Sequence, residues 1–278
     1  MNAPLSVTAS GVFTALKTIV DPDGLAPPNS GCWRTITVTA PKGCVLNAEF
    51  PSPVVYANHE ISHRVCDMTF GAVAPFWPDN VMTCSQGTSA VVTFGGKDPR
   101  NGQRYVSYET IKGGFGARPN KDGINAVASG ISNTMNTPIE VLEMSFPVRV
   151  EEYALTPDSG GPGEYRGGLA AHRTWSVLGH KARASSCLER TLSAPFGLAG
   201  GGPGMAARIW TEATDGTLRP APGKGGFDVP DGGKIHLQVP GSGGYGDPKA
   251  RDRAALREDV LDGYVSEQAA REVYGMEE

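Results

Sequence analysis

The residues best suited to chemistry lie in one glycine-rich segment: Gly113, Gly114, Gly116, Arg118 and Asp122. The backbone N–H groups of such a loop can bind an anion or stabilise a developing oxyanion. Arg118 adds a mobile cation, and Asp122 supplies a carboxylate that can orient the loop or a neighbouring ligand. No glycine–lysine–serine or –threonine sequence occurs at phosphate-loop spacing, and no helical pattern follows directly, which excludes the common nucleotide-binding loops. By spacing alone, a functional loop and a structural loop fit this segment equally well.

A second glycine-rich segment, residues 158–168, lies between two runs with strand-like patterns. Its five glycines and one proline exclude a helix or an ordinary strand and predict a tight loop. Rigid loops in a β framework often carry function, but Ser159 lacks the sequence of a nucleophile elbow. We expect Asp158 and Arg166 to pair with each other or to brace this loop.

The histidines and carboxylates offer weaker candidates. His59 and His63 are four residues apart on a predicted helix, with Glu60 between them, so both imidazoles face one side. Their order differs by one residue from the HExxH zinc motif, and no third ligand is near, so we interpret them as a surface or structural pair. Glu140 and Glu143 would face opposite sides of a predicted strand, which argues against a paired-carboxylate site.

Composition narrows the class of protein. The chain has 278 residues with 37 glycines and 22 prolines, and 39% of its residues are hydrophobic, enough to bury a core in one large or two modest domains. A net charge of −4 gives no electrostatic footprint for nucleic acid, and no apolar run reaches membrane-spanning length. The N-terminus lacks the basic region of a secretory signal. Five scattered cysteines without a CxxC pair predict a reduced, cytoplasmic protein with no thiolate zinc site.

Hydrophobic periodicity predicts an α+β fold that is β-rich, with glycine-loop connections and a helical C-terminal tail. Helices are expected at 11–20 and 58–74, and as one or two helices within 251–274. Strands are expected at 34–39, 86–94, 104–111, 139–155, 169–187, 206–213 and 234–239. In the helix at 58–74, an apolar face is expected from Ile61, Val65, Met68 and Ala72.

Four segments carry longer motifs in a fixed order. They are NSGCWRTITVTAPKGCVLNAEFPSPV, GGFGARPNKDGINA, DSGGPGEYRGGLAAHRTW and GSGGYGDPKARDRAALREDVLDGYVSEQAAREVYG. Together these motifs resemble the hydantoinase B/oxoprolinase family, the B component of N-methylhydantoinase-type enzymes, which is related to the large subunits of acetone and acetophenone carboxylases. The resemblance runs from residue 11 to the C-terminus, with Ser242 as a departure from the unbroken glycine run of the closing motif.

The resemblance implies that residues 1–278 form only the C-terminal half of a hydantoinase B-like subunit, with a sub-boundary near residue 156 between 1–155 and 156–278. In the family, His and Asp motifs of the N-terminal half bind the catalytic metal. None of those motifs occurs here, so no metal ligand is transferred to this chain. Because the sequence starts at Met1 and reads as complete, we expect a split hydantoinase B-type subunit whose partner chain supplies the metal-bearing half.

The resemblance also implies a function. We expect a subunit of an ATP-dependent amidohydrolase that acts on cyclic amides of the hydantoin, oxoproline or lactam type. A hydantoinase A-type ATPase subunit would bind ATP and phosphorylate the small-molecule substrate, and the N-terminal half-subunit would hold Mn, Zn or Fe. The isolated chain is expected to be inactive, and neither nucleic acid nor a membrane is an expected partner. The alternatives are a subunit of an ATP-dependent ketone carboxylase and a non-catalytic scaffold subunit.

Overall fold

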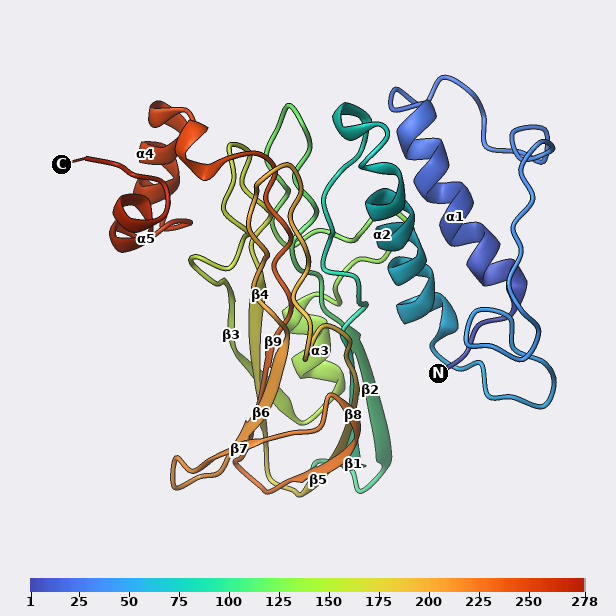
Figure 1. Cartoon of the computed structure of the whole chain (residues 1–278). Coiled ribbons are helices and arrows are strands. Elements are labelled where there is room, and N and C mark those ends of the chain that lie inside the picture. Colours follow the sequence, from blue (N-terminus) through green and yellow to red (C-terminus); the bar gives the residue numbers. More distant parts are fainter. Residues whose placement is uncertain (278) are drawn as a thin grey trace.

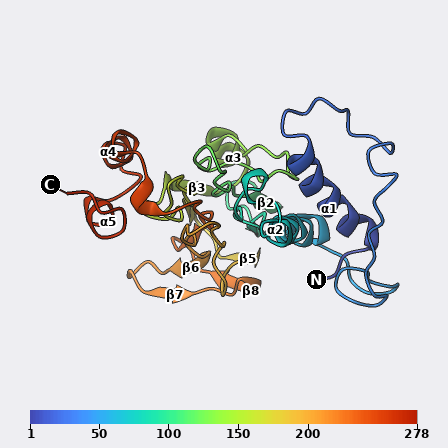
Figure 2. The same cartoon turned by 45° about the horizontal axis from the view of Figure 1, so that its top comes forward.

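The computed structural model describes residues 1–277, in which two antiparallel sheets lie between helices at opposite ends of the molecule (Figure 1, Figure 2). The helices near the N-terminus are α1 (Leu5–Val20), the π-helical turn η1 (Ala57–Ile61) and α2 (Ser62–Val73). The C-terminal tail holds α4 (Arg253–Leu261) and α5 (Glu267–Glu272). The remaining helical elements are η2 (Pro78–Asn80), α3 (Ile139–Ser145) and η3 (Pro248–Ala250). The expected α+β class with a helical C-terminal tail is confirmed.

The first sheet has the order β2-β1-β5-β8 and the second β3-β4-β9-β6-β7, with antiparallel pairing throughout. The strands of the first sheet are β1 (Val91–Lys97), β2 (Arg104–Thr110), β5 (Ala182–Cys187) and β8 (Lys224–Val229). Those of the second are β3 (Val148–Leu155), β4 (Ala171–Val177), β6 (Arg208–Glu212), β7 (Leu218–Pro220) and β9 (Lys234–Gln238). Both sheets combine strands from before and after residue 156, and a sub-boundary there stays a prediction.

The main core lies between the two sheets. Side chains alternate along a strand, so every second residue of each strand points inward. From β1 these are Val92 and Phe94, and from β4 they are Trp175 and Val177, all fully buried. The rings of Phe94 and Trp175 are 6.0 Å apart between centroids, a distance at which aromatic pairs interact favourably. This contact joins the two sheets into one core.

Helix α1 packs along α2 beside the sheets (Figure 1). Gly11 allows the close approach, since a Cβ atom at this position would lie 2.9 Å from both the Ser62 carbonyl oxygen and the Val65 side chain. Apolar residues of both helices then form a separate small core with residues of the following segment: Ala15, Ile19, Cys66, Phe70, Val81 and Met82. The helix pair therefore presents one side of α2 to the glycine-rich loops.

Three expectations about local structure are wrong. Residues 34–39 form no strand, because within residues 1–277 no strand pairs with this alternating segment to complete a ladder. The region 139–155 begins with helix α3 and becomes a strand only at Val148, so Glu140 and Glu143 lie on one side of a helix instead of on opposite faces. In α2, Met68 is 59% exposed, and the buried face instead includes His63 and Asp67.

Candidate functional site

Residues 113–123, the segment predicted to carry chemistry, cross two other glycine-rich segments, residues 158–168 and 241–246. The backbones of these segments are in direct contact. A Cβ atom on Gly114 would collide with the carbonyl of Gly168, and one on Gly123 would collide with the backbone of Gly168. The phenylalanine between them is held by the same partner, because Gly168 N donates to Phe115 O at 3.2 Å. Glycine is required here for the close approach of chains. We call residues 113–123, 158–168 and 241–246 together the glycine crossing.

Two of the three amides predicted to form an anion cradle donate hydrogen bonds inside the protein. Gly114 N donates to Pro240 O at 3.1 Å, and Gly116 N donates to Ser85 Oγ at 3.1 Å. Gly113 is buried beside them, and its carbonyl accepts from Val127 N at 3.0 Å. An anion would have to displace these bonds to use the amides of Gly114 and Gly116.

Arg118 lies at the open side of the crossing. Its Nη2 donates to the carbonyl of Asp122 at 2.7 Å, and its guanidinium lies 5.7 Å from the centre of the Phe115 ring. The side chain borders a hollow of about 670 Å³ between the loop and the end of α1. The hollow is also lined by Ile19, Asp79, Met82, Phe115 and Lys121. Among the sequence-predicted residues, Arg118 borders this hollow and Asp122 borders a smaller one of about 350 Å³ beside Arg251.

Asp122 connects the loop to the C-terminal segment. Both of its carboxylate oxygens accept from the Arg251 guanidinium at 2.7 Å, and one also accepts from Arg166 N at 2.7 Å. Burial alone would raise the pKa of this carboxyl, but the hydrogen bonds and charge of Arg251 hold that pKa below its usual value. A bidentate charged pair of this kind fixes geometry, so Asp122 orients the loop.

Asp158 and Arg166 do not pair with each other, which corrects one sequence expectation. Asp158 accepts a hydrogen bond from Ser266 N at 2.8 Å. Arg166 pairs with Asp259 of α4 at 3.2 Å, with both side chains buried. Each therefore fastens the second glycine segment to the C-terminal helices, because its partner lies in the tail and not in its own loop.

A buried polar cluster under the start of this loop was not predicted as a site. Its members are Glu60, His63, Gln86 and Lys112, each at most 4% exposed. Within the described residues, no hydrogen-bond partner is found for Glu60 Oε2, Lys112 Nζ, Gln86 Oε1 and Gln86 Nε2. His63 is satisfied on one side, since its Nδ1 lies 2.6 Å from Ser129 Oγ. Polar atoms buried without partners are rare in native proteins and require an explanation.

Burial shifts the protonation of this polar cluster towards neutral groups. It raises the pKa of Glu60 to about 8 and lowers the pKa of Lys112. It also lowers the pKa of His63 to about 4, with the charge of Lys112 adding to the effect. Desolvation disfavours the charged form in each case. Titratable groups shifted in this way gather at functional sites more often than elsewhere.

The sequence contained a signal for the polar cluster. Glu60, His63 and Asp67 recur at helical spacing on one face of a helix that must pack against the protein. Our sequence interpretation treated the histidines as a surface or structural pair. In the structure His63 is buried and bonded to Ser129, while His59 is half-buried. A row of polar residues on a helix face that packs against the protein was therefore the sequence feature that indicated the buried polar cluster.

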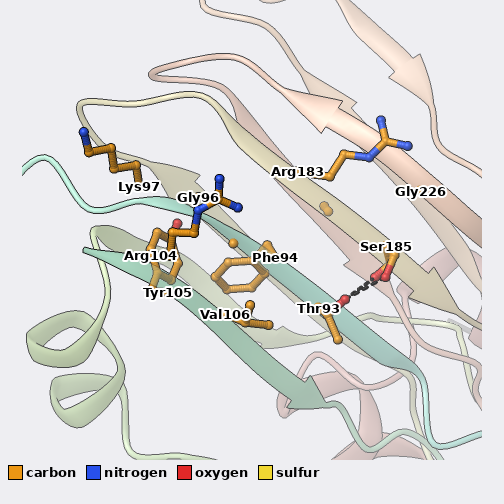
Figure 3. A pocket seen from close by; sticks show the side chains of 12 residues that line it. Thr93, Phe94, Gly96, Lys97, Arg104, Tyr105, Val106, Arg183, Ser185 and Gly226 are labelled. Atoms are coloured by element: carbon orange, nitrogen blue, oxygen red, sulfur yellow. Dashed lines mark hydrogen bonds between the residues drawn. The ribbon is translucent and has the colours of Figure 1, made fainter. Parts of the chain in front are cut away.

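A different hollow, of about 580 Å³, lies on the outer face of the first sheet (Figure 3). Lys97, Arg104 and Arg183 border it, and Thr93 and Ser185 share a hydrogen bond of 2.6 Å across neighbouring strands. Its lining contains no carboxylate, and Arg183 is already paired with Asp228 on β8. This hollow offers cations but no acid–base pair.

The described residues contain no cluster of metal ligands. Among residues 1–277, no group of three or more His, Cys, Asp or Glu side chains is placed to hold a metal ion. No helix in the same part of the chain has the length and apolarity needed to cross a membrane.

Comparison with known proteins identifies the family. The family described as hydantoinase B/oxoprolinase matches residues 1–248, and the chain belongs to it. A relative named as the putative B-type subunit of a D-/L-hydantoinase, from a Pseudomonas species, is 32% identical over 284 residues, covering 99% of this chain and 47% of that protein. The crystal structure of the ATP-dependent caprolactamase from Pseudomonas jessenii matches with a TM-score of 0.84 at 28% identity, over 96% of this chain and 48% of that one.

A more distant structure shares the fold alone. Acetone carboxylase in its nucleotide-free structure matches with a TM-score of 0.77 at 20% identity, over 99% of this chain and 41% of that chain. The chain thus spans about half the length of the hydantoinase relative and of the caprolactamase, and about a fifth of the 5-oxoprolinase from Dictyostelium discoideum. The resemblance inferred from the four sequence motifs, to the hydantoinase B/oxoprolinase family, is confirmed.

Proposed function

We propose that this chain is the C-terminal half of a hydantoinase B-type unit in an ATP-dependent amidohydrolase acting on cyclic amides. The observation that carries the proposal is the match of 96% of the chain to one half of a caprolactamase chain, at 28% identity and a TM-score of 0.84. That protein is described as ATP-dependent and acts on a cyclic amide by name. The family membership of residues 1–248 supports the same assignment.

The proposed assembly divides the chemistry among partners. An ATPase subunit of hydantoinase A type binds ATP and phosphorylates the amide oxygen of the substrate. An N-terminal half of hydantoinase B type holds the divalent metal, Mn, Zn or Fe. The donor set of the present chain does not fit that metal, because residues 1–277 contain no suitable group of three ligands. A metal-dependent step would therefore belong to the N-terminal half.

The glycine crossing and Arg118 are proposed to form this chain's wall of the shared site. Gly113, Gly114 and Gly116 let the backbone segments meet, and Asp122 fixes the loop through Arg251. Arg118 then borders the adjoining hollow, where a guanidinium can hold the phosphoryl group of an activated substrate. In this arrangement Arg118 contacts the substrate, while the glycines and Asp122 position it.

A ketone carboxylase subunit is the second candidate, favoured by the shared fold with acetone carboxylase. Both reactions use an oxygen activated by phosphorylation, and they differ in whether water or a carboxylating species reacts next. A third candidate is a non-catalytic scaffold, favoured by the internal hydrogen bonds of the Gly114 and Gly116 amides.

Reconstitution with an N-terminal half and an A-type ATPase tests the proposal. ATP-dependent opening of a lactam, hydantoin or oxoproline ring is expected, and incorporation of labelled bicarbonate into a ketone would instead establish the carboxylase. Arg118→Gln should reduce turnover by about 10-fold or more, since one lost charge contact in the transition state has this order of effect. Arg104→Gln, on the separate sheet hollow, is the matched control. Equal turnover in both variants would favour the scaffold.

A further inference from the structure

A long segment between α1 and η1 lies outside the packed body of the chain. Residues 21–56 contain no helix and no strand beyond one isolated bridge, and none of these residues is buried. Figure 1 and Figure 2 show most of this segment on the side of α1 that faces away from the sheets. Loops of this length without secondary structure are uncommon in compact domains, and they are usually functional or disordered. We call residues 21–56 the arm.

The arm is fastened to α1 and to the residues that precede it. In the middle of the arm, the ring of Trp33 stacks on Phe13 of α1, with 4.7 Å between ring centroids and 8° between the ring planes. Further along, Ala3 binds the arm through both of its backbone groups. Its N–H donates to the Val45 carbonyl at 2.8 Å, and its carbonyl accepts from the Ala48 N–H at 2.9 Å. These contacts hold the arm in one place, so its exposed side chains have a fixed arrangement.

The last part of the arm presents apolar side chains to solvent, of which Phe50 is 99% exposed and Val55 is 68% exposed. The N-terminus lies against this part of the arm, because Asn2 Nδ2 donates to the Pro53 carbonyl at 3.0 Å. Single exposed apolar residues are normal, but a group of them marks an interaction surface. We call this group the N-terminal patch, and its members are Met1, Val45, Phe50, Val54 and Val55.

The arm also connects the N-terminal patch to the hollow beside Arg118. Pro22 and Asp23, near the start of the arm, line that hollow together with Ile19 of α1. The patch lies at the start of α1 and the hollow at its end, and the 16 residues of this helix span about 24 Å. A protein unit of about the same length as this chain has a radius of gyration of about 19 Å. One partner is therefore wide enough to contact both places.

We propose that the N-terminal patch and the arm dock the N-terminal half of the hydantoinase B-type unit. This inference rests on the proposed function and names the surface through which the two halves of that unit meet. The docked half covers Phe50 and Val55 and reaches the hollow beside Arg118 from the same side of the chain. Docking along the arm thus brings the two halves together at the hollow that is assigned to the substrate.

The length of the relatives favours this occupant. The chain matches 48% of the caprolactamase chain and 47% of the hydantoinase relative, so about as much protein again lies outside each match. In both relatives the remainder belongs to the same polypeptide as the matching half. Under the proposed function the remainder precedes Met1, which lies in the N-terminal patch, so the preceding half reaches this chain at the patch. A second copy of this chain on the patch would separate the two halves at the point where they adjoin.

Binding of this chain to a separately expressed N-terminal half tests the inference, with the Kd measured by isothermal titration calorimetry. Phe50→Ser should raise the Kd at least about 10-fold, because an aromatic side chain buried at an interface commonly contributes this much. Val55→Ser carries the same expectation should Phe50→Ser alter the arm. Leu261→Ser is the matched control, since Leu261 is 85% exposed on α4 at the opposite end of the molecule (Figure 1). Its Kd should stay within about 2-fold of wild type.

Each outcome separates the docking surface from the proposed function. An unchanged Kd in both patch variants, an equal loss in Leu261→Ser, or no association of the wild-type halves would overturn the inference. Sedimentation of this chain alone checks for a second copy. A dimer that Phe50→Ser dissociates, with unchanged affinity for the N-terminal half, would assign the patch to a second copy and overturn the inference. If the halves associate through the patch but the reconstituted complex cleaves no cyclic amide, the proposed function fails and the docking surface stands.

Hydrogen exchange gives a readout that needs no substitution. Backbone amides within residues 45–55 should exchange at least about 10-fold more slowly in the complex than in the chain alone, because docking covers them. Amides of residues 213–217, in the turn between β6 and β7, are the control and should exchange at the same rate in both. Unchanged exchange within residues 45–55 would overturn the inference even where the halves associate.

Discussion

The glycine crossing and the buried polar cluster are neighbours in sequence, since Lys112 directly precedes Gly113, but they are built on opposite principles. In the crossing, the backbones touch and the donors of Gly114 and Gly116 have partners. In the polar cluster, the side chains of Glu60 and Lys112 are buried, and within residues 1–277 each has an atom without a hydrogen-bond partner. The comparison teaches that a run of glycines can mark close packing, whereas unpaired buried polar atoms mark capacity for chemistry.

The largest expected effect comes from a substitution that disrupts the packing of the glycine crossing. Gly114→Ala places a methyl group against the Gly168 carbonyl and 2.6 Å from Ser242 N, both backbone atoms that cannot move aside. We expect a loss of about 4 kcal/mol or more of unfolding free energy, as in the most damaging single substitutions. Urea unfolding measures it. Gly130→Ala, where nothing lies within 4 Å of the added methyl, is the control and should change stability little. Similar stability of the two variants would contradict the packing role.

The next effect concerns the ion pair at the edge of the polar cluster. Arg190 Nη2 lies 2.8 Å from Asp67 Oδ2, and both side chains are about 6% exposed. Arg190→Met leaves the Asp67 carboxylate buried without its main partner and should cost about 3 kcal/mol. The exposed pair of Arg271 and Glu267 is the matched case, and Arg271→Met should cost less than about 0.5 kcal/mol. Thermal unfolding compares them, and equal shifts would show that burial does not matter here.

The two regions differ in how far the sequence predicts them. The helix at 58–74 and the strand at 104–111 follow from local periodicity and are present. The segment 34–39 has an equally good strand pattern but no partner strand, and partners are a property of the whole fold. For the same reason, the sequence marks the glycine segments without showing that they cross one another.

The residues of the candidate site are likewise only partly predictable from the sequence. Arg118 and Asp122 were predicted as site residues from the sequence. In the structure Arg118 borders a hollow, and Asp122 forms an ion pair with Arg251. Glu60 and Lys112 are 52 residues apart by number, and only the fold brings these two titratable groups into one buried cluster. Whether a carboxyl group is desolvated depends on neighbours from distant segments, so its shifted pKa cannot be obtained from composition or spacing.

A smaller effect is the pH dependence of stability that Glu60 produces. Its pKa is about 8 in the folded state and about 4.5 in the unfolded chain, so folding favours the protonated form. Its stabilising contribution is complete below pH about 4.5 and is lost as the pH rises through about 8. Glu60→Gln should therefore gain on the order of 2 kcal/mol relative to wild type between pH 6 and pH 8. Urea unfolding at both pH values measures this gain, and Glu189→Gln should not reproduce it. A constant difference between wild type and Glu60→Gln would contradict the raised pKa.

The smallest effect sharpens the contrast, because it predicts a gain of stability when a buried polar group is removed. Lys112 Nζ is buried without a hydrogen-bond partner in the described chain, so Lys112→Met removes an unpaired ammonium and keeps most of the side-chain volume. Stability should rise by about 1 kcal/mol, whereas Lys249→Met, at an exposed position, should leave it within about 0.5 kcal/mol. Thermal unfolding measures the stability of both variants. Polar groups buried without partners cost stability, so a Lys112→Met variant that is less stable than wild type would place Lys112 with the packing residues of the crossing instead.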